Sequence, residues 1–170
     1  MPLTVIYRLI DRLSELTGRM LAWLSLLMML MLCLVVVLRY GFGIGLIGLQ
    51  EGVTYLHASI FMLGAAYTLK QDGHVRVDIL YRNFSPRAKA WVNSLGGIIF
   101  LLPLCCYIFF ISWDFVVQSW QIGEVSTEPG GIPAVFLLKT LIPLMAINLG
   151  LQALAEILRS ALILMETADD

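Results

Sequence analysis

The chain has 170 residues, of which 59% are hydrophobic and 14% are charged, whereas a soluble globular domain has about 45–50% apolar and about 25% charged residues. This composition excludes an ordinary soluble domain and indicates a protein that lies in a membrane. The net charge of −1 gives no basic field that would favour nucleic acid as a partner.

Residues 1–19 predict an amphipathic helix, because apolar residues recur at helical spacing and charged residues take the other face. The apolar positions are Val5, Ile6, Leu9, Ile10, Leu13 and Leu16, and the charged positions are Arg8, Asp11, Arg12, Glu15 and Arg19. Such a helix would lie in the headgroup layer with its charges in water. The alternative is that these residues extend the first membrane span into the cytoplasm.

Four segments are long and apolar enough to cross a bilayer, which takes about 20 residues. They are residues 20–38, 49–69, 91–113 and 132–158. We therefore predict an all-α integral membrane protein with four transmembrane helices in one membrane domain, residues 1–170. The first segment is longer than the apolar region of a cleaved signal peptide, which has about 7–15 residues, and it follows 19 other residues, which disfavours such a peptide.

The basic residues predict the orientation, because short cytoplasmic loops are rich in Lys and Arg. Nine of the eleven lie before the first span, in the connection 70–90 or after the fourth span. The opposite side has Arg39 alone, Lys139 lies inside the fourth span, and the connection 114–131 has three acids and no base. Both termini should therefore face the cytoplasm, and the connection 114–131 should be periplasmic.

The connection 70–90 contains "HVRVDI", which places His74, Arg76 and Asp78 opposite three apolar residues. A lone strand would have no sheet to join, so we expect an extended or irregular run. Asp78 would either form a local salt bridge with Arg76 or Arg82, or contact a partner subunit or an anionic lipid headgroup.

Two turn signals flank the second span. After "HVRVDI" we expect a helix with Ser85 as its N-cap and Pro86 as its first residue. Before the span, Gly43, Gly45 and Gly48 match the dinucleotide pattern G-x-G-x-x-G, but they lie between two membrane segments and not in a βαβ unit. We interpret these glycines as a tight turn.

Ionisable groups within spans are costly and usually face a partner. Arg39 ends the first span, Glu51 begins the second, and Lys139 lies about 10 Å along the fourth. Their matched depth and opposite signs predict a charge cluster on the periplasmic side that fixes helix packing. The alternative is three separate charges that extend to the interface.

The second and fourth spans each carry a polar face. On the second span, small and hydrogen-bonding residues share one face, which is typical of contact between helices in lipid. These residues are Gln50, Thr54, His57, Phe61, Gly64 and Thr68. We interpret His57 as a hydrogen-bonded core residue and not as a proton relay. On the fourth span, Asn148, Gln152 and Glu156 share a face opposite Lys139, which predicts two protein neighbours.

No residue pattern predicts catalysis or a bound cofactor. His57 is the only histidine within a span, whereas haem between helices usually has two axial ligands. The cysteines, Cys33, Cys105 and Cys106, lie in apolar segments without a C-x-x-C pair. We therefore predict a partner subunit without enzyme activity. The alternative is a stand-alone four-helix membrane protein with a redox or signalling function that uses His57 and the cysteines.

The chain resembles the small integral-membrane (DctQ-type) subunit of tripartite ATP-independent periplasmic (TRAP) transporters. The motifs that carry the resemblance are "RYGFG" from Arg39, "LQEGVTYLHASIFMLGAAYTLKQDGHVRVDIL" from Leu49, "SPRAKAW" from Ser85, "GIPAVFLLKTLIPL" from Gly131 and "LQALAEILRS" after it. The most specific element is a Glu near the start of the second span, a Gly at its centre and then "GHVRVD".

The resemblance implies a bacterial inner-membrane protein that braces a large, multi-span permease subunit. The large subunit would bind sodium and carry a small organic anion, a carboxylate or sugar acid, delivered by a periplasmic binding protein. Membrane phospholipids are the other expected partners, and no cofactor or metal is expected in this chain. We take the following residues as structural or partner-interface candidates: Arg39, Glu51, His57, Gly64, His74, Arg76, Asp78, Lys139 and Glu156.

Overall fold

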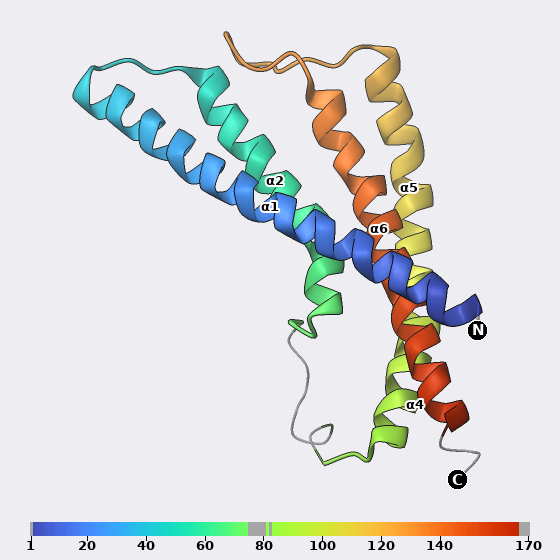
Figure 1. The fold of residues 1–170 in the computed structure, drawn as a ribbon. Coiled ribbons are helices and arrows are strands. Elements are labelled where there is room, and N and C mark those ends of the chain that lie inside the picture. Colours follow the sequence, from blue (N-terminus) through green and yellow to red (C-terminus); the bar gives the residue numbers. More distant parts are fainter. Residues whose placement is uncertain (1, 75–80, 82, 167–170) are drawn as a thin grey trace.

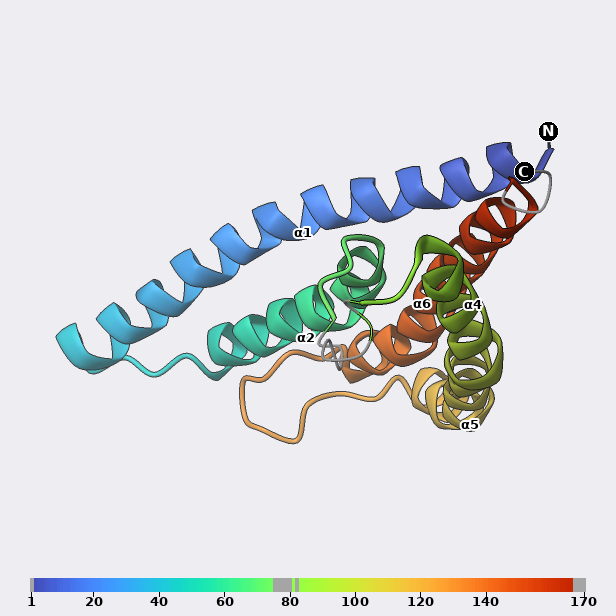
Figure 2. The same ribbon diagram turned by 90° about the horizontal axis from the view of Figure 1, so that it is seen from below.

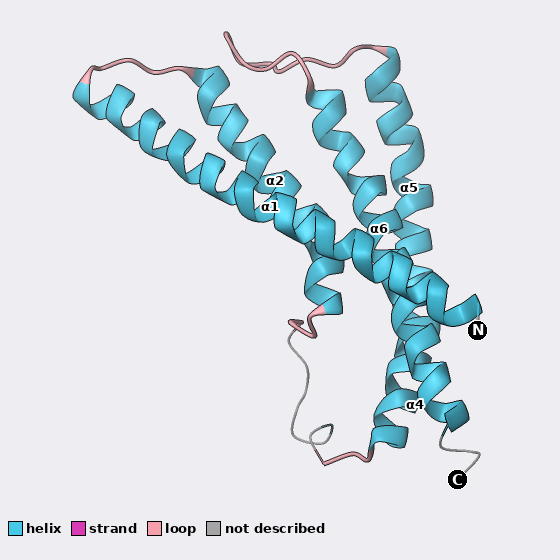
Figure 3. Cartoon of the chain, viewed as in Figure 1, coloured by secondary structure: helices cyan, strands magenta, loops and turns pink. Residues whose placement is uncertain are grey.

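The computed structural model describes residues 2–74, 81 and 83–166. Its helices are α1 (Pro2–Gly41), α2 (Ile47–Lys70), α4 (Pro86–Gly96), the π-helical turn η1 (Gly97–Leu101), α5 (Leu102–Gln121) and α6 (Val135–Glu166). Because α4, η1 and α5 follow one another without a break, they form one rod. The described residues contain no strand, which confirms the predicted all-α class (Figure 3).

Helices α2 and α6 pack side by side, α1 crosses both of them, and the α4–α5 rod packs against α6 (Figures 1 and 2). The α1–α2 and α5–α6 connections lie at one end of the molecule, which we name the upper end after its place in Figure 1. The start of α4 and the end of α6 lie at the opposite, lower end.

Helix α1 is a single unbroken helix of 40 residues, where the sequence predicted an interfacial helix and a separate span. Residues 3–41 contain no proline, so no proline breaks the helix between the predicted interfacial segment and the predicted span. At the junction Gly18 allows close packing on α2, because a Cβ there would lie 2.4 Å from the ring of Tyr67. A helix of this length extends about 60 Å, about twice the roughly 30 Å of a bilayer core.

Apart from Leu21 and Val116, the buried side chains among the described residues are small or polar, whereas many large apolar side chains are exposed on the outside. Among the described residues the most deeply buried are Ser14, Ala66, Ser119, Gln152, Ala153 and Ala155. Small and polar residues at helix contacts with apolar residues outside are typical of helices that pack together in lipid.

Three helical segments of the described chain are long and apolar enough to cross a membrane: Thr4–Gly41, Pro86–Gln121 and Val135–Met165. The sequence predicted four spans. The remaining long helix, α2, has 24 residues, which is sufficient length, but it carries Gln50, Glu51, His57 and Lys70 and is not among these three segments.

The π-helical turn η1 lies where the rod must accommodate Pro103, the second residue of α5. A proline inside an α-helix has no N–H to donate, and its ring meets the carbonyl four residues earlier. In the wider turn, the N–H of Leu102 reaches the carbonyl of Gly97, five residues back. Gly97 also faces α6, because a Cβ there would lie 2.8 Å from Ile157.

The start of α4 confirms the predicted cap. The hydroxyl of Ser85 accepts a hydrogen bond from the N–H of Ala88 at 3.3 Å, and Pro86 is the first helical residue. His74 precedes this region as an exposed side chain whose Nε2 lies 3.3 Å from the carbonyl oxygen of Ala65. The predictions for Arg76 and Asp78 fall outside the described residues.

Candidate functional site

At the upper end, Glu51 ties the start of α2 to the α5–α6 connection. Its carboxylate accepts a hydrogen bond from the hydroxyl of Ser126 and a second one from the N–H of Ile132 at 2.6 Å. Gly131 leaves room for this contact, since a Cβ there would lie 2.8 Å from Glu51 Oε1. The connection is therefore held down over α2 by one carboxylate.

A second carboxylate of this connection, Glu124, is bound by Lys139 of α6. The Lys139 Nζ lies 2.5 Å from Glu124 Oε2, and the hydroxyl of Ser119 donates to the same oxygen at 2.6 Å. The hydrogen bond from Lys139 and then the one from Ser119 lower the pKa of Glu124 below its usual value. Lys139 also lies 3.9 Å from the ring centre of Phe115. We name Glu51, Glu124, Ser126, Ile132 and Lys139 the upper cluster.

The upper cluster corrects the predicted pairing of Arg39, Glu51 and Lys139. Glu51 bonds to a hydroxyl and a backbone N–H, Lys139 pairs with Glu124, and Arg39 is exposed. Within the described residues Arg39 forms no ion pair. The prediction used depth and charge sign, neither of which specifies lateral position, and the end of α1 diverges sideways from α5 and α6 (Figure 1).

Toward the lower end, a buried polar network joins α1 to α6. The Ser14 hydroxyl donates to Gln152 Oε1 at 2.7 Å, and Gln152 Nε2 donates to Asp11 Oδ1 at 3.0 Å. Arg159 completes the network, with Nη2 at 2.5 Å from Asp11 Oδ2 and Nη1 at 3.0 Å from Glu156 Oε1. We name Asp11, Ser14, Gln152, Glu156 and Arg159 the lower network.

The polar face of α6 contacts α1 and α2 of the same chain. The sequence predicted that Asn148, Gln152 and Glu156 share a face, and the structure sets that face against the same chain. Asn148 Nδ2 donates to the carbonyl of Leu63 in α2 at 3.1 Å, and Gln152 meets α1. Glu156 is thus a structural residue in this network.

The sequence analysis missed the α1 side of these contacts. Asp11 was placed on a face exposed to water, but only 17% of its side chain is exposed, and Ser14 was not considered. Glu15, another charge of that face, pairs with Lys70 at the end of α2 at 2.7 Å. One feature of the sequence could have indicated these contacts. Ser14 follows Asp11 by three residues, so both lie on one face of the helix and can bind an amide side chain such as that of Gln152.

The polar face of α2 points away from the chain, which corrects the interpretation of His57 as a core residue. Thr54, His57 and Phe61 are exposed, and the rings of His57 and Phe61 are stacked with their centres 6.5 Å apart. Gly64 lies at the edge of this face, where a Cβ would be 3.6 Å from Leu21 of α1. The exposed part of the predicted seam, which is Thr54, His57 and Phe61, therefore has no partner helix among the described residues.

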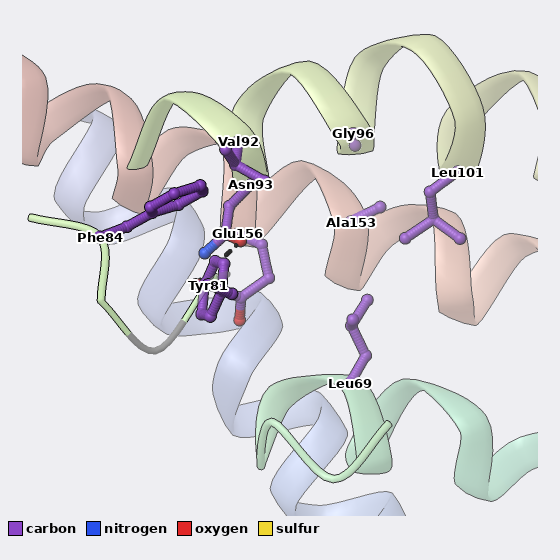
Figure 4. Close-up of a pocket in the computed structure, with 10 residues that line it drawn as sticks. Leu69, Tyr81, Phe84, Val92, Asn93, Gly96, Leu101, Ala153 and Glu156 are labelled. Atoms are coloured by element: carbon purple, nitrogen blue, oxygen red, sulfur yellow. Dashed lines mark hydrogen bonds between the residues drawn. The ribbon is translucent and has the colours of Figure 1, made fainter. Parts of the chain in front are cut away.

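An open cavity of about 490 Å³ lies between α2, the α4–η1 segment and α6 (Figure 4). Its wall is mainly apolar, and its polar side chains include Glu156 from the lower network and Asn93, which accepts a hydrogen bond from the Tyr81 hydroxyl at 3.1 Å. Among the described residues, no three His, Cys, Asp or Glu side chains are grouped as a metal site would require.

Comparison of the sequence with known protein families gives a match over most of the chain. Residues 28–162 match the family described as tripartite ATP-independent periplasmic transporters, DctQ component. The chain belongs to the DctQ family. It is therefore a component of a TRAP transporter and a membrane protein with several spans. The family match includes the upper cluster and the α6 side of the lower network, but not Asp11 or Ser14.

One relative within this group is a protein of Haemophilus influenzae named "Putative TRAP transporter small permease protein". It is 31% identical over 108 residues, which is 62% of this chain. The match covers 66% of the relative, so the chain spans slightly less than two thirds of its length. No solved structure matches the chain.

Proposed function

We propose that this chain is the small permease subunit of a TRAP secondary transporter and braces the large, sodium-coupled membrane subunit. The observation that carries the proposal is the DctQ family match over residues 28–162. The transported molecule is a small organic anion, a carboxylate or sugar acid, which a periplasmic binding protein delivers. Sodium and this anion bind the large subunit.

The arrangement of the helices supports a bracing role. Carboxylates tie α2, α6 and the α5–α6 connection together at the upper end, and the lower network ties α1 to α6. These hydrogen bonds and ion pairs lie inside the subunit, whereas large apolar side chains cover its outside. Such a body can hold its shape while offering apolar surface to a larger membrane protein.

The proposed topology has four spans in the bacterial inner membrane with both termini in the cytoplasm. Its support is that α2 runs beside α6 between the upper and lower ends, and that nine of the eleven Lys and Arg residues belong to the predicted cytoplasmic side. The acidic connection at the upper end then faces the periplasm.

Co-purification tests the proposed function. The chain is tagged, expressed with the large permease subunit that the proposal requires, and extracted in a mild detergent. We expect a multi-span protein to purify with it in a fixed ratio, and anion uptake in reconstituted vesicles to require both proteins. A homogeneous, unaccompanied 19.0 kDa subunit that is dispensable for uptake would contradict the proposal.

A further inference from the structure

Helix α2 is the long helix that is not among the three candidate spans, and it has an uncovered side. On two sides it is packed: Gly52 contacts Met31 of α1, and the Leu63 carbonyl binds Asn148 of α6. The third side carries Thr54, His57 and Phe61, of which Phe61 is 75% exposed. We name these three residues the outward face of α2.

In the proposed four-span topology, the outward face places a polar ring at the depth of the acyl chains. His57 is the eleventh of the 24 residues of α2, so it lies about 15 Å from the start of the helix and close to the middle of a span of roughly 30 Å. Within the described part of the chain, its imidazole forms no hydrogen bond and only stacks on Phe61. Acyl chains cannot bond to imidazole, and an unpaired polar ring in lipid is costly.

The outer surface of α5 is a second exposed helix surface of the same chain and serves as the comparison. Phe110 is 72% exposed, nearly as much as Phe61, and its exposed helical neighbours Tyr107, Ile111 and Trp113 offer large rings and aliphatic groups. Exposure therefore does not distinguish the two surfaces. They differ in the polar groups that they expose: the outward face of α2 exposes an imidazole near the middle of its helix, whereas α5 exposes the phenol of Tyr107 and the indole of Trp113.

We propose that the outward face of α2 is the docking surface for a transmembrane helix of the large permease subunit, which bonds to His57 and packs around Phe61. This inference rests on the proposed function, which supplies the partner. The chemistry of the face supports a protein occupant over lipid, because a transmembrane helix can carry a donor or acceptor at that depth.

Photo-crosslinking of the co-expressed complex tests the proposal. p-Benzoylphenylalanine replaces Phe61 in one sample and Phe110 in the matched control. We expect irradiation to join the large subunit to position 61, with a yield at least several-fold above that of position 110. Equal yields at the two positions, a product of two small subunits at position 61, or no protein product there would overturn the proposal.

A second measurement uses variants of the central ring. His57→Leu should lower the amount of large subunit that co-purifies by about tenfold, as expected for an interface anchor, whereas His57→Asn, which keeps hydrogen-bonding groups, should retain most of it. Phe110→Leu is the control and should have no effect. If the wild type co-purifies but neither crosslinking nor His57→Leu distinguishes the α2 face, this inference fails while the proposed function stands. If the wild type itself does not co-purify, the proposed function fails.

Discussion

The upper cluster and the lower network both hold helices together through carboxylates, but Glu51 of the upper cluster also uses a backbone donor. Glu51 accepts from a backbone N–H and a hydroxyl of the α5–α6 connection. In the lower network, Asp11 and Glu156 accept hydrogen bonds only from two side chains of α6, those of Gln152 and Arg159. The reason is that backbone groups within a helix are already bonded to the helix itself, whereas a connection has free N–H groups.

This difference predicts that the lower network is the more sensitive of the two. An exposed connection can offer a second N–H or water when one bond is lost, but two packed helices cannot. The first two predictions below test the α1 contacts, and the last two test the upper cluster.

Removing the central amide of the lower network should have the largest effect. Gln152→Leu leaves the buried Ser14 hydroxyl without its acceptor and leaves Asp11 paired with Arg159 alone, and we expect a loss of about 3 kcal/mol in the free energy of unfolding. The measurement is unfolding by SDS titration of the detergent-solubilised protein. Gln121→Leu, at the exposed end of α5, is the matched control and should be close to neutral.

Closing the space at Gly18 should have the next largest effect, because α1 reaches α6 only while it packs closely on α2. Gly18→Ala puts a methyl group into the Tyr67 ring and should cost about 2 kcal/mol through overpacking. Gly96→Ala is the control, since nothing lies within 4 Å of its Cβ position. It should stabilise the helix slightly. Similar unfolding curves for both variants would show that the α1–α2 contact is unimportant for stability.

Neutralising Glu51 should have a smaller effect than either change. Glu51→Gln keeps one acceptor oxygen for Ser126 or Ile132 but loses the charge-assisted bonds. We expect a modest fall in the thermal midpoint, and no change for Glu128→Gln, an exposed carboxylate of the same connection. A fall as large as that of Gln152→Leu would contradict the difference between the two regions.

The smallest effect should be the pH dependence that Glu124 contributes. Because Lys139 and Ser119 lower its pKa in the folded protein, its contribution to stability is complete above the unfolded value of about 4.3. It is lost as the pH falls through the lower, folded-state pKa. Thermal unfolding of the wild type and Glu124→Gln between pH 7 and pH 3 should differ by a constant amount down to about pH 4.3 and then converge. A constant difference down to pH 3 would argue against this contribution.

Much of the local structure was predictable from sequence. Ser85 followed by proline predicted the start of α4, because both the capping hydroxyl and the fixed φ of proline act within one turn. The apolar segments likewise predicted an all-helical chain. The failures concern lateral position: Arg39 shares a depth with Glu51 but diverges from the α5–α6 connection, and His57 lies on a polar face that points outward.

The sequence by itself determined the helical class, the membrane character and the family, because hydrophobic periodicity, charge distribution and motifs are properties of the chain order. Only the tertiary structure decided that Asp11 meets Gln152 across 141 positions and that Lys139 pairs with Glu124. It also decided that the seam of α2 is left open. Those outcomes depend on how helices cross and rotate about their axes, and depth along a membrane does not specify either.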